Sequence, residues 1–386
     1  MRFLPRASLR TLLPAAALLT FWLACGDDDG GGGPPVDEIP PDTEITAGPM
    51  GDADIGSGMF TFSSEPDATY ECRIDGAPFV TCTSPWTVNI TVGDHVFEVR
   101  AIDAAGNRDE TPAQRMYRGV APTTGTRVRL VAANLTSGNL QGYEPGDGSR
   151  ILKGLKPDIV MVQEFNYFPG NGTAEIRAWV DDVFGANFQF YREVGAQIPN
   201  GVVSRYPILA AGTWEDTRSP NREFVWARID VPGPKDLWAV SVHLLTDDTP
   251  GTRDGEATEL RALIEANVPA SAYLVIGGDF NTDTRSEACV TVLSGLVSNG
   301  APYPADQAGN SNTSAPRSKP YDWLMMNAAL RATMTPVVIG ANSFPNGLVF
   351  DSRVYTPLAD VAPALVTDSA ALNMQHQAVV VDVRLQ

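Results

Sequence analysis

The stretch YLVIGGDFN, from Tyr273 to Asn281, decides the fold of the larger part of this 386-residue chain. Its first four residues are apolar and include β-branched side chains, which is typical of a buried strand. Its last residues include a carboxylate and an amide, which a hydrophobic core excludes unless they are hydrogen-bonded. The stretch therefore predicts a buried strand that delivers Asp279 and Asn281 to the edge of a sheet.

Three further apolar runs also end in polar side chains. They are Val128–Ala133 before Asn134, Ile159–Val162 before Gln163 and Glu164, and Leu237–Val242 before His243. Helical periodicity lies between the runs, at 176–184 and 260–264, and this alternation predicts an α/β sandwich. Singly, each polar residue also fits a strand cap. Because loops at strand ends converge above rigid strands, we expect these side chains to share one rim.

The region over 40–120 differs, because short β-type runs alternate there with turn signals. This spacing predicts a small β-sandwich, and Tyr70–Gly76 together with Phe97–Asn107 resembles the Ig-like modules of bacterial surface proteins. Cys72 and Cys82 lie in adjacent runs of this region and can form a disulfide across two strands.

Two segments without core-forming residues mark the boundaries of these folded parts. A Pro/Gly/Thr linker over 121–126 precedes the α/β domain expected over 127–386, and a flexible acidic, Gly- and Pro-rich tether over 25–39 precedes the β-sandwich.

The first 24 residues have the pattern of an export signal. A basic start precedes an apolar stretch, Leu12 to Leu23, that is too short to span a bilayer. The following Cys25 completes a sequence that resembles a bacterial lipobox; a plain cleaved signal peptide with an incidental cysteine is the alternative. We expect an exported lipoprotein of the cell envelope or the extracellular space, a monomer anchored to a membrane by lipid on Cys25, with no transmembrane helix.

The charge of the chain limits its partners. Its 46 acidic and 28 basic side chains give a formal net charge of −18. An acidic surface repels polyanions and loses most of the binding free energy that counterion release provides. The net charge therefore excludes a basic clamp for nucleic acid that extends over the whole chain. A local phosphate track remains open, and solvated surface charge is the alternative for its five candidates. These are Arg205, Arg218, Arg222, Arg317 and Lys319.

Read in chain order, the polar positions from Arg127 to Gln386 form a recognisable series. The series is Asn134, Gln163-Glu164, Asn200 to Ile208, Asn221-Arg222-Glu223, Val242-His243, Gly278 to Asn281, Tyr321-Asp322-Trp323 and His376. It resembles the endonuclease/exonuclease/phosphatase family, which includes pancreatic deoxyribonuclease. The resemblance implies a four-layer α/β sandwich, two packed sheets flanked by helices, that hydrolyses phosphoesters.

The same resemblance implies a metal site. Mg²⁺, or Mn²⁺, prefers one or two carboxylates plus water and neutralises phosphoryl oxygens, and Glu164 is the expected ligand, oriented by Asn134. Arg222 and Asn200 are expected to contact the substrate phosphate. The family usually has Asp directly before its last His, whereas Gln375 stands here. The loss of that charge leaves open whether one or two metal ions bind.

Two pairs of imidazole and carboxylate are implied for proton transfer, because a carboxylate fixes the tautomer of its imidazole and raises its basicity. Asp322 is expected to pair with His376 near the attacking water, and Glu223 with His243 near the leaving group. The resemblance also assigns Asp279 and Asn281 to holding the phosphoryl group or the water.

The sequence therefore predicts an exported Mg²⁺-dependent phosphodiesterase or nuclease in which water attacks phosphorus. Its substrate could be nucleic acid, a phospholipid headgroup or a small phosphoester, since no residue identifies the leaving group. The alternative is a non-catalytic surface lipoprotein that binds a partner through its Ig-like module and keeps the second domain as a degenerate scaffold. Only Gln375 favours that alternative.

Overall fold

The computed structural model describes residues 37–120, 124–137, 141–168, 170–246 and 251–386. The expected signal peptide, Cys25 and most of the tether lie outside these ranges, as does the start of the linker. None of the helices within these ranges has the length and apolar character needed to cross a membrane.

The first folded part is a small β domain of two sheets. One sheet has the order β1 (Glu44–Ala47), β3 (Gly56–Ser63), β6 (Trp86–Ile90), and the other β2 (Gly51–Asp54), β8 (Ala113–Val120), β7 (Gly93–Ile102), β4 (Thr69–Ile74), β5 (Val80–Cys82). Its own hydrophobic core includes Phe60 and Phe97, whose rings stack at 4.0 Å. The predicted disulfide between Cys72 and Cys82 is confirmed and joins β4 to β5. The likeness to Ig modules stays a prediction.

The second folded part contains two large sheets. The first has the order β11 (Gln189–Arg192), β12 (Gly201–Ser204), β10 (Ile159–Val162), β9 (Thr126–Ala133), β22 (Ala378–Leu385), β18 (Met334–Thr335), and β21 (Leu348–Phe350) also pairs with β22. The second has the order β13 (Ile208–Trp214), β14 (Phe224–Ile229), β15 (Leu237–His243), β16 (Tyr273–Asp279), β17 (Asp322–Met326).

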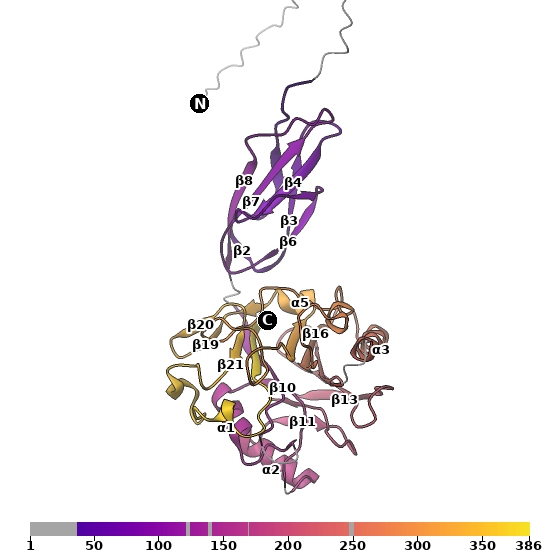
Figure 1. The fold of residues 1–386 in the computed structure, drawn as a ribbon, viewed down its shortest axis with the longest axis vertical. Coiled ribbons are helices and arrows are strands. Elements are labelled where there is room, and N and C mark those ends of the chain that lie inside the picture. The colour runs from indigo at the N-terminus through magenta and orange to yellow at the C-terminus, as the bar shows by residue number, and fades with distance from the viewer. Residues whose placement is uncertain (1–36, 121–123, 138–140, 169, 247–250) are drawn as a thin grey trace, which may run out of the picture. The chain divides into compact units, whose positions relative to one another are not determined.

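Helices cover the outer faces of these sheets (Figure 1). The α-helices are α1 (Asp147–Leu155), α2 (Thr173–Val183), α3 (Thr252–Asn267), α4 (Ala288–Thr291) and α5 (Ala328–Arg331). Smaller elements are the hairpin of β19 (Val337–Ile339) and β20 (Asn342–Phe344) and the 3-10 helices η2 (Leu358–Val361) and η3 (Asp368–Ala370).

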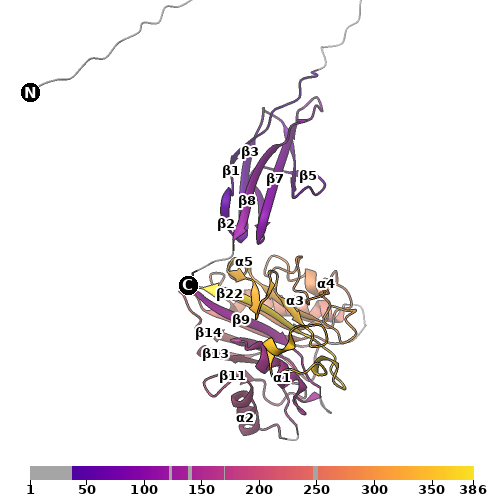
Figure 2. The same ribbon diagram turned by 90° about the vertical axis from the view of Figure 1, so that its left-hand side faces the viewer.

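The layers follow from strands that are apolar on both faces. Along β9, Leu130 packs into the core between the two sheets, whereas its neighbour Val131 packs against α1 and α2. On the far side, α3 and α4 cover the second sheet through residues such as Leu260 and Cys289. Figure 2 shows the same layers from another side. The predicted four-layer α/β sandwich is confirmed, and it explains why the apolar runs are continuous rather than alternating.

A buried ion pair joins the central strands β9 and β22. The Arg129 guanidinium donates from Nε and Nη2 to the two carboxylate oxygens of Asp382, each at 2.8 Å. Its Nη1 donates to the carbonyl of Leu155 at the end of α1, also at 2.8 Å. Since both side chains are buried, each charge depends on the other for compensation.

Replacing Asp382 with alanine leaves the Arg129 charge buried without its anion, so we expect the free energy of unfolding to fall by about 3–5 kcal/mol. Chemical denaturation measures the loss. Asp236→Ala is the control, because it breaks an exposed pair with Arg228 at 3.8 Å that is worth at most about 1 kcal/mol. Equal losses in the two variants would contradict the role given to the buried pair.

Candidate active site

Three strand ends of the second sheet place His243, Asp279 and Asp322 in one row. β15 and β16 run parallel with His243 opposite Asp279, and β16 and β17 run antiparallel with Asp279 opposite Asp322. Opposite positions on neighbouring strands lie only about 5 Å apart, so the strand register alone brings the three side chains together. All three are buried.

The first sheet contributes Asn134 and Glu164, which follow the parallel strands β9 and β10. The Asn134 amide donates to Glu164 Oε1 at 3.3 Å, and the Thr136 hydroxyl donates to Oε2 at 3.0 Å. The backbone of Glu164 has a φ of +50°, a left-handed conformation that a residue with a side chain adopts at a cost. The structure thus holds this carboxylate at the rim in a strained but well-supported position.

The carboxylate of Asp279 is the centre of the site. Its Oδ2 accepts from the Asn134 amide at 3.1 Å and lies 3.4 Å from Nε2 of both His243 and His376. Its Oδ1 accepts the backbone N–H of Asn281 at 2.8 Å. One side chain therefore joins residues from both sheets, and the structure brings together the five residues Glu164, His243, Asp279, Asp322 and His376.

His376 pairs with Asp322 as the family resemblance implied. Its Nδ1 lies 3.0 Å from Asp322 Oδ2, and the backbone N–H of Asp322 donates to the Thr313 hydroxyl at 2.7 Å. Burial opposes the charged imidazole, but Asp279 and Asp322 outweigh it and raise the pKa of His376 to about 10. Because Asp322 occupies Nδ1, the Nε2 atom is the one that faces Asp279 and the centre of the site.

His243 has the opposite electrostatic environment. Burial, and then the positive charge of Arg222, lowers the pKa of His243 well below its usual value, so its imidazole is neutral. Its Nδ1 has no hydrogen-bond partner among the described residues. The two histidines of the site therefore differ in charge before any ligand binds.

The expected pair of Glu223 and His243 is not seen in the described part of the chain. The backbone N–H of Glu223 donates to the Glu193 carboxylate at 2.8 Å, its carbonyl accepts the Asn200 amide at 2.7 Å, and no hydrogen bond links its carboxylate to Nδ1 of His243 among the described residues. Burial raises the pKa of Glu193 to about 7. Glu193 and Asn200 thus fix the backbone at Glu223, and the pairing of its side chain with His243 stays a prediction.

Arg222 also differs from its expected place against the substrate phosphate. Its buried guanidinium donates from Nε to the carbonyl of His243, from Nη2 to that of Leu244 at 2.8 Å, and from Nη1 to Asn221 at 2.9 Å. With every nitrogen engaged, Arg222 supports the end of β15 and lowers the pKa of His243. Asn200, which donates to the carbonyl of Glu223, likewise supports the backbone of the rim.

Most of the expected phosphate track consists of side chains that are already neutralised. The ion pairs are Arg205–Asp158 at 3.1 Å, Arg317–Asp306 at 2.6 Å and Lys319–Asp283 at 2.6 Å. Arg218 is exposed. Ion pairing within the chain is therefore the better description of Arg205, Arg317 and Lys319, and the alternative of solvated surface charge fits only Arg218.

The donor atoms of the site fit a divalent cation. Ligand atoms of Asp279, Asp322 and His376 lie within 4.8 Å of one another. Glu164 adds a carboxylate that is 7% exposed, and the buried Oδ1 of Asn134 has no partner in the described part of the chain. Clustered carboxylate and amide oxygens are the ligands that Mg²⁺ and Mn²⁺ prefer. Gln375 is exposed and contributes a backbone carbonyl to Ala315 at 2.7 Å.

Several supporting residues have no sequence signal. Tyr143 is buried, donates its hydroxyl to the carbonyl of Ala133 at 3.1 Å and lies 3.4 Å from that of Gln163. These carbonyls directly precede Asn134 and Glu164, so one phenol ties together the strand ends that carry both. Neither its spacing nor its context in the sequence singles out Tyr143, and the same is true of Thr136 and Thr313.

The fold and this rim define a phosphoester hydrolase of the α/β-sandwich class. The chain belongs to the endonuclease/exonuclease/phosphatase family, whose sequence profile matches residues 138–344, more than half of the chain. Members of this family hydrolyse phosphoester bonds. No curated protein matches the sequence.

Several solved structures are similar at low sequence identity. An endonuclease/exonuclease/phosphatase from Beutenbergia cavernae is 17% identical over 67% of this chain and 72% of its own, with a TM-score of 0.44. The 3′ phosphatase NExo from Neisseria, bound to a product DNA hairpin, is 14% identical over 66% and 99%, with a TM-score of 0.44. TDP2 from D. rerio, with a single-strand DNA product, is 16% identical over 67% and 98%, with a TM-score of 0.43.

Tyr143→Phe should lower the free energy of unfolding by about 1–3 kcal/mol, because the buried acceptors lose their donor. Denaturant titration of the full chain tests this. Tyr206→Phe is the matched control: it deletes a hydroxyl that accepts from Arg205 in an exposed setting, where we expect a change within about 0.5 kcal/mol. A Tyr143 variant as stable as this control would show that the phenol does not hold the strand ends.

Proposed function

We propose that this protein is an exported, Mg²⁺-dependent phosphodiesterase that cleaves P–O bonds by attack of water. One observation carries the proposal: two buried imidazoles of opposite charge character meet the carboxylates of Asp279 and Glu164 at a single rim. Hydrolysis needs one group that takes a proton from the attacking water and one that donates to the phosphate oxygens, and two imidazoles beside the same carboxylate can divide these tasks.

Residues at the end of the first sheet are proposed to bind the cation. Glu164 supplies the principal carboxylate, and Asn134 orients it through the bond to Oε1 at 3.3 Å. Bound there, Mg²⁺ or Mn²⁺ would neutralise the phosphoryl oxygens and offset the carboxylates that raise the pKa of His376. Because Gln375 is exposed and carries no charge, we propose a single metal ion.

His376 is assigned to the attacking water. Asp322 holds its Nδ1 at 3.0 Å, which fixes the ring. With a bound cation offsetting the charge of the nearby carboxylates, the imidazole would become neutral and its Nε2 could accept a proton. Burial of the pair excludes competing solvent and keeps the imidazole in one orientation. Asp279, 3.4 Å from that Nε2, is positioned to accept a hydrogen bond from the same water or to stabilise the charged imidazole.

His243 is assigned to the phosphate and leaving group. The low pKa of His243 keeps its imidazole neutral. One ring nitrogen can therefore donate to a phosphoryl oxygen without electrostatic repulsion between the imidazole and the bound metal ion. Arg222 holds the backbone carbonyl of His243 and thereby its position. Asn281, whose amide donates to the Leu244 carbonyl at 2.8 Å and whose φ is +50°, lies beside it as a further phosphate contact.

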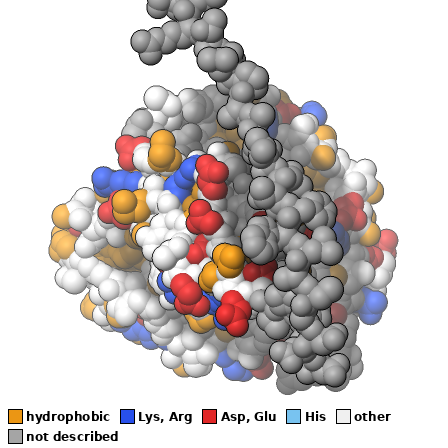
Figure 3. Space-filling view, turned by 90° about the horizontal axis from the view of Figure 1, so that it is seen from above, with side chains coloured by type: hydrophobic (Ala, Val, Ile, Leu, Met, Phe, Trp, Pro, Cys, Tyr) orange, Lys and Arg blue, Asp and Glu red, His pale blue; other side chains and the backbone are white. Residues whose placement is uncertain are grey.

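The proposed reaction does not select one class of substrate. Nucleic acid, a phospholipid headgroup and a soluble phosphoester all present the same phosphorus centre. On the face seen in Figure 3, the described acidic and basic side chains are intermixed and form no single basic area. We propose a monomeric lipoprotein of the cell envelope, anchored through Cys25, because a tether of Gly, Pro and Asp follows that residue.

The full chain should hydrolyse bis(p-nitrophenyl) phosphate with Mg²⁺, and chelation should stop the reaction. His376→Ala should lower the rate at least about 100-fold, the contribution of a general base. The chain has three histidines, and His95→Ala is the matched control because His95 lies in the β domain, bonded to Asp75. A His376 variant that retains its rate, or a rate that survives chelation, would refute this mechanism and favour the non-catalytic alternative.

A further inference from the structure

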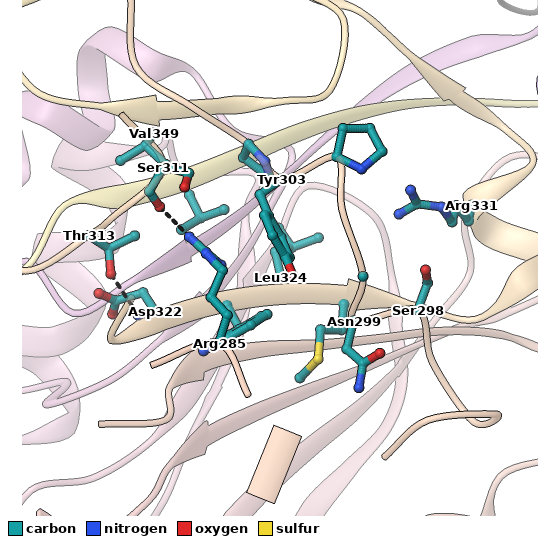
Figure 4. A pocket seen from close by; sticks show the side chains of 16 residues that line it. Arg285, Ser298, Asn299, Tyr303, Ser311, Thr313, Asp322, Leu324, Arg331 and Val349 are labelled. Atoms are coloured by element: carbon teal, nitrogen blue, oxygen red, sulfur yellow. Dashed lines mark hydrogen bonds between the residues drawn. The ribbon is translucent and has the colours of Figure 1, made fainter. Parts of the chain in front are cut away.

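A small open cavity of about 30 Å³ lies along β17, on the edge of the second sheet (Figure 4). Four consecutive residues of that strand, from Asp322 to Met325, form one wall. β16 pairs with one edge of β17, and outside the bridge from Ser298 to Met326 no described strand pairs with the other. The cavity therefore reaches Asp322, a residue of the candidate active site.

Arg285 projects into this cavity between Ser311 and Tyr303 (Figure 4). Its guanidinium stacks on the Tyr303 ring at 4.0 Å and lies 4.9 Å from the Trp323 ring, and its Nη2 donates to the Ser311 carbonyl at 2.5 Å. Two rings and one carbonyl hold the group in place. They leave its remaining N–H groups free to bind a ligand.

The Arg285 charge is uncompensated. Burial lowers the pKa of Arg285, and none of the described carboxylates forms an ion pair with it. Asp322 is the one acidic residue among the described residues that line the cavity, and its charge is shared with His376. Arg331 lines the opposite end (Figure 4). In a chain of net charge −18, a cavity with two guanidinium groups and one neutralised carboxylate is a local exception that favours an anion.

Resting on the proposed function, we infer that this cavity is a second phosphoryl subsite, in which Arg285 binds a phosphate group of the substrate other than the one being hydrolysed. A guanidinium presents parallel N–H donors that match two phosphate oxygens. Stacking on aromatic rings fixes the orientation of the guanidinium and leaves these N–H donors available for the phosphate. The substrate would then carry at least two phosphoryl groups. The second could be a terminal phosphomonoester or the next phosphodiester of a strand.

A purely structural role for Arg285 predicts something different. The bond to Ser311 and the stacking on Tyr303 also tie together two loops, so replacing Arg285 could loosen the fold without removing a ligand contact. A structural clamp would affect ligands with one phosphate and with two equally. The number of phosphates on the ligand is therefore the variable that separates the two roles.

Titration calorimetry on the full chain, with a chelator present to prevent turnover, should compare thymidine 5′-monophosphate with thymidine 3′,5′-bisphosphate and the dinucleotide pTpT. We expect the second phosphate to tighten binding about tenfold or more, as charged hydrogen bonds do. A gain confined to the bisphosphate identifies a terminal monoester, and a gain retained by pTpT identifies a neighbouring diester. No gain from either ligand would overturn the inference.

Arg285→Gln should abolish the gain and leave the affinity for the monophosphate unchanged. Arg285→Lys, which keeps the charge but loses the planar fork, should retain part of it. Arg228→Gln, the same change of charge at a residue outside the cavity, should retain all of it. A gain that persists in Arg285→Gln, or an equal loss for all three ligands, would overturn the subsite even if hydrolysis of bis(p-nitrophenyl) phosphate is intact, so the two proposals fail separately.

Discussion

The rest of the site depends on one buried carboxylate oxygen, Oδ2 of Asp279. It accepts from Asn134 at 3.1 Å and lies 3.4 Å from Nε2 of both His243 and His376. An ionised carboxylate that is 1% exposed is unstable unless such partners surround it. The hydrogen-bonding requirement of this one carboxylate brings together side chains from both sheets. Because the Asn134 amide also donates to Glu164, it links Glu164 to the same group of residues. Burial still raises the pKa of Asp279, which shows that its partners do not fully replace water.

The sequence was sufficient to predict the strands and the residues at their ends. Leu130–Ala133 and Tyr273–Ile276 are continuous apolar runs because both of their faces are buried, one against the other sheet and one against helices. Once two strands are paired, their register determines which end residues meet. For this reason His243 and Asp279 could be assigned to one rim from their positions at strand ends. Asp322 came only from the family resemblance, and the register places it opposite Asp279.

Side chains on loops could not be predicted in the same way, because their direction depends on distant contacts. Arg222 turns toward the carbonyls of His243 and Leu244, and Glu193, far away in sequence, holds the backbone at Glu223. Tyr143 and Arg285 act through partners that no local pattern reveals. The uncompensated charge of Arg285 appears only when the surrounding carboxylates are placed in space. Loop residues thus determine how the site is supported and what it binds.

The central claim is that Glu164, Asp279 and the two imidazoles surround one divalent cation. Anomalous diffraction from crystals of the chain grown with Mn²⁺ tests it most directly. We expect a single strong peak at the rim, at about 2.1 Å from an oxygen of Glu164. A peak only at exposed acidic residues, with none in contact with Glu164, would contradict the claim.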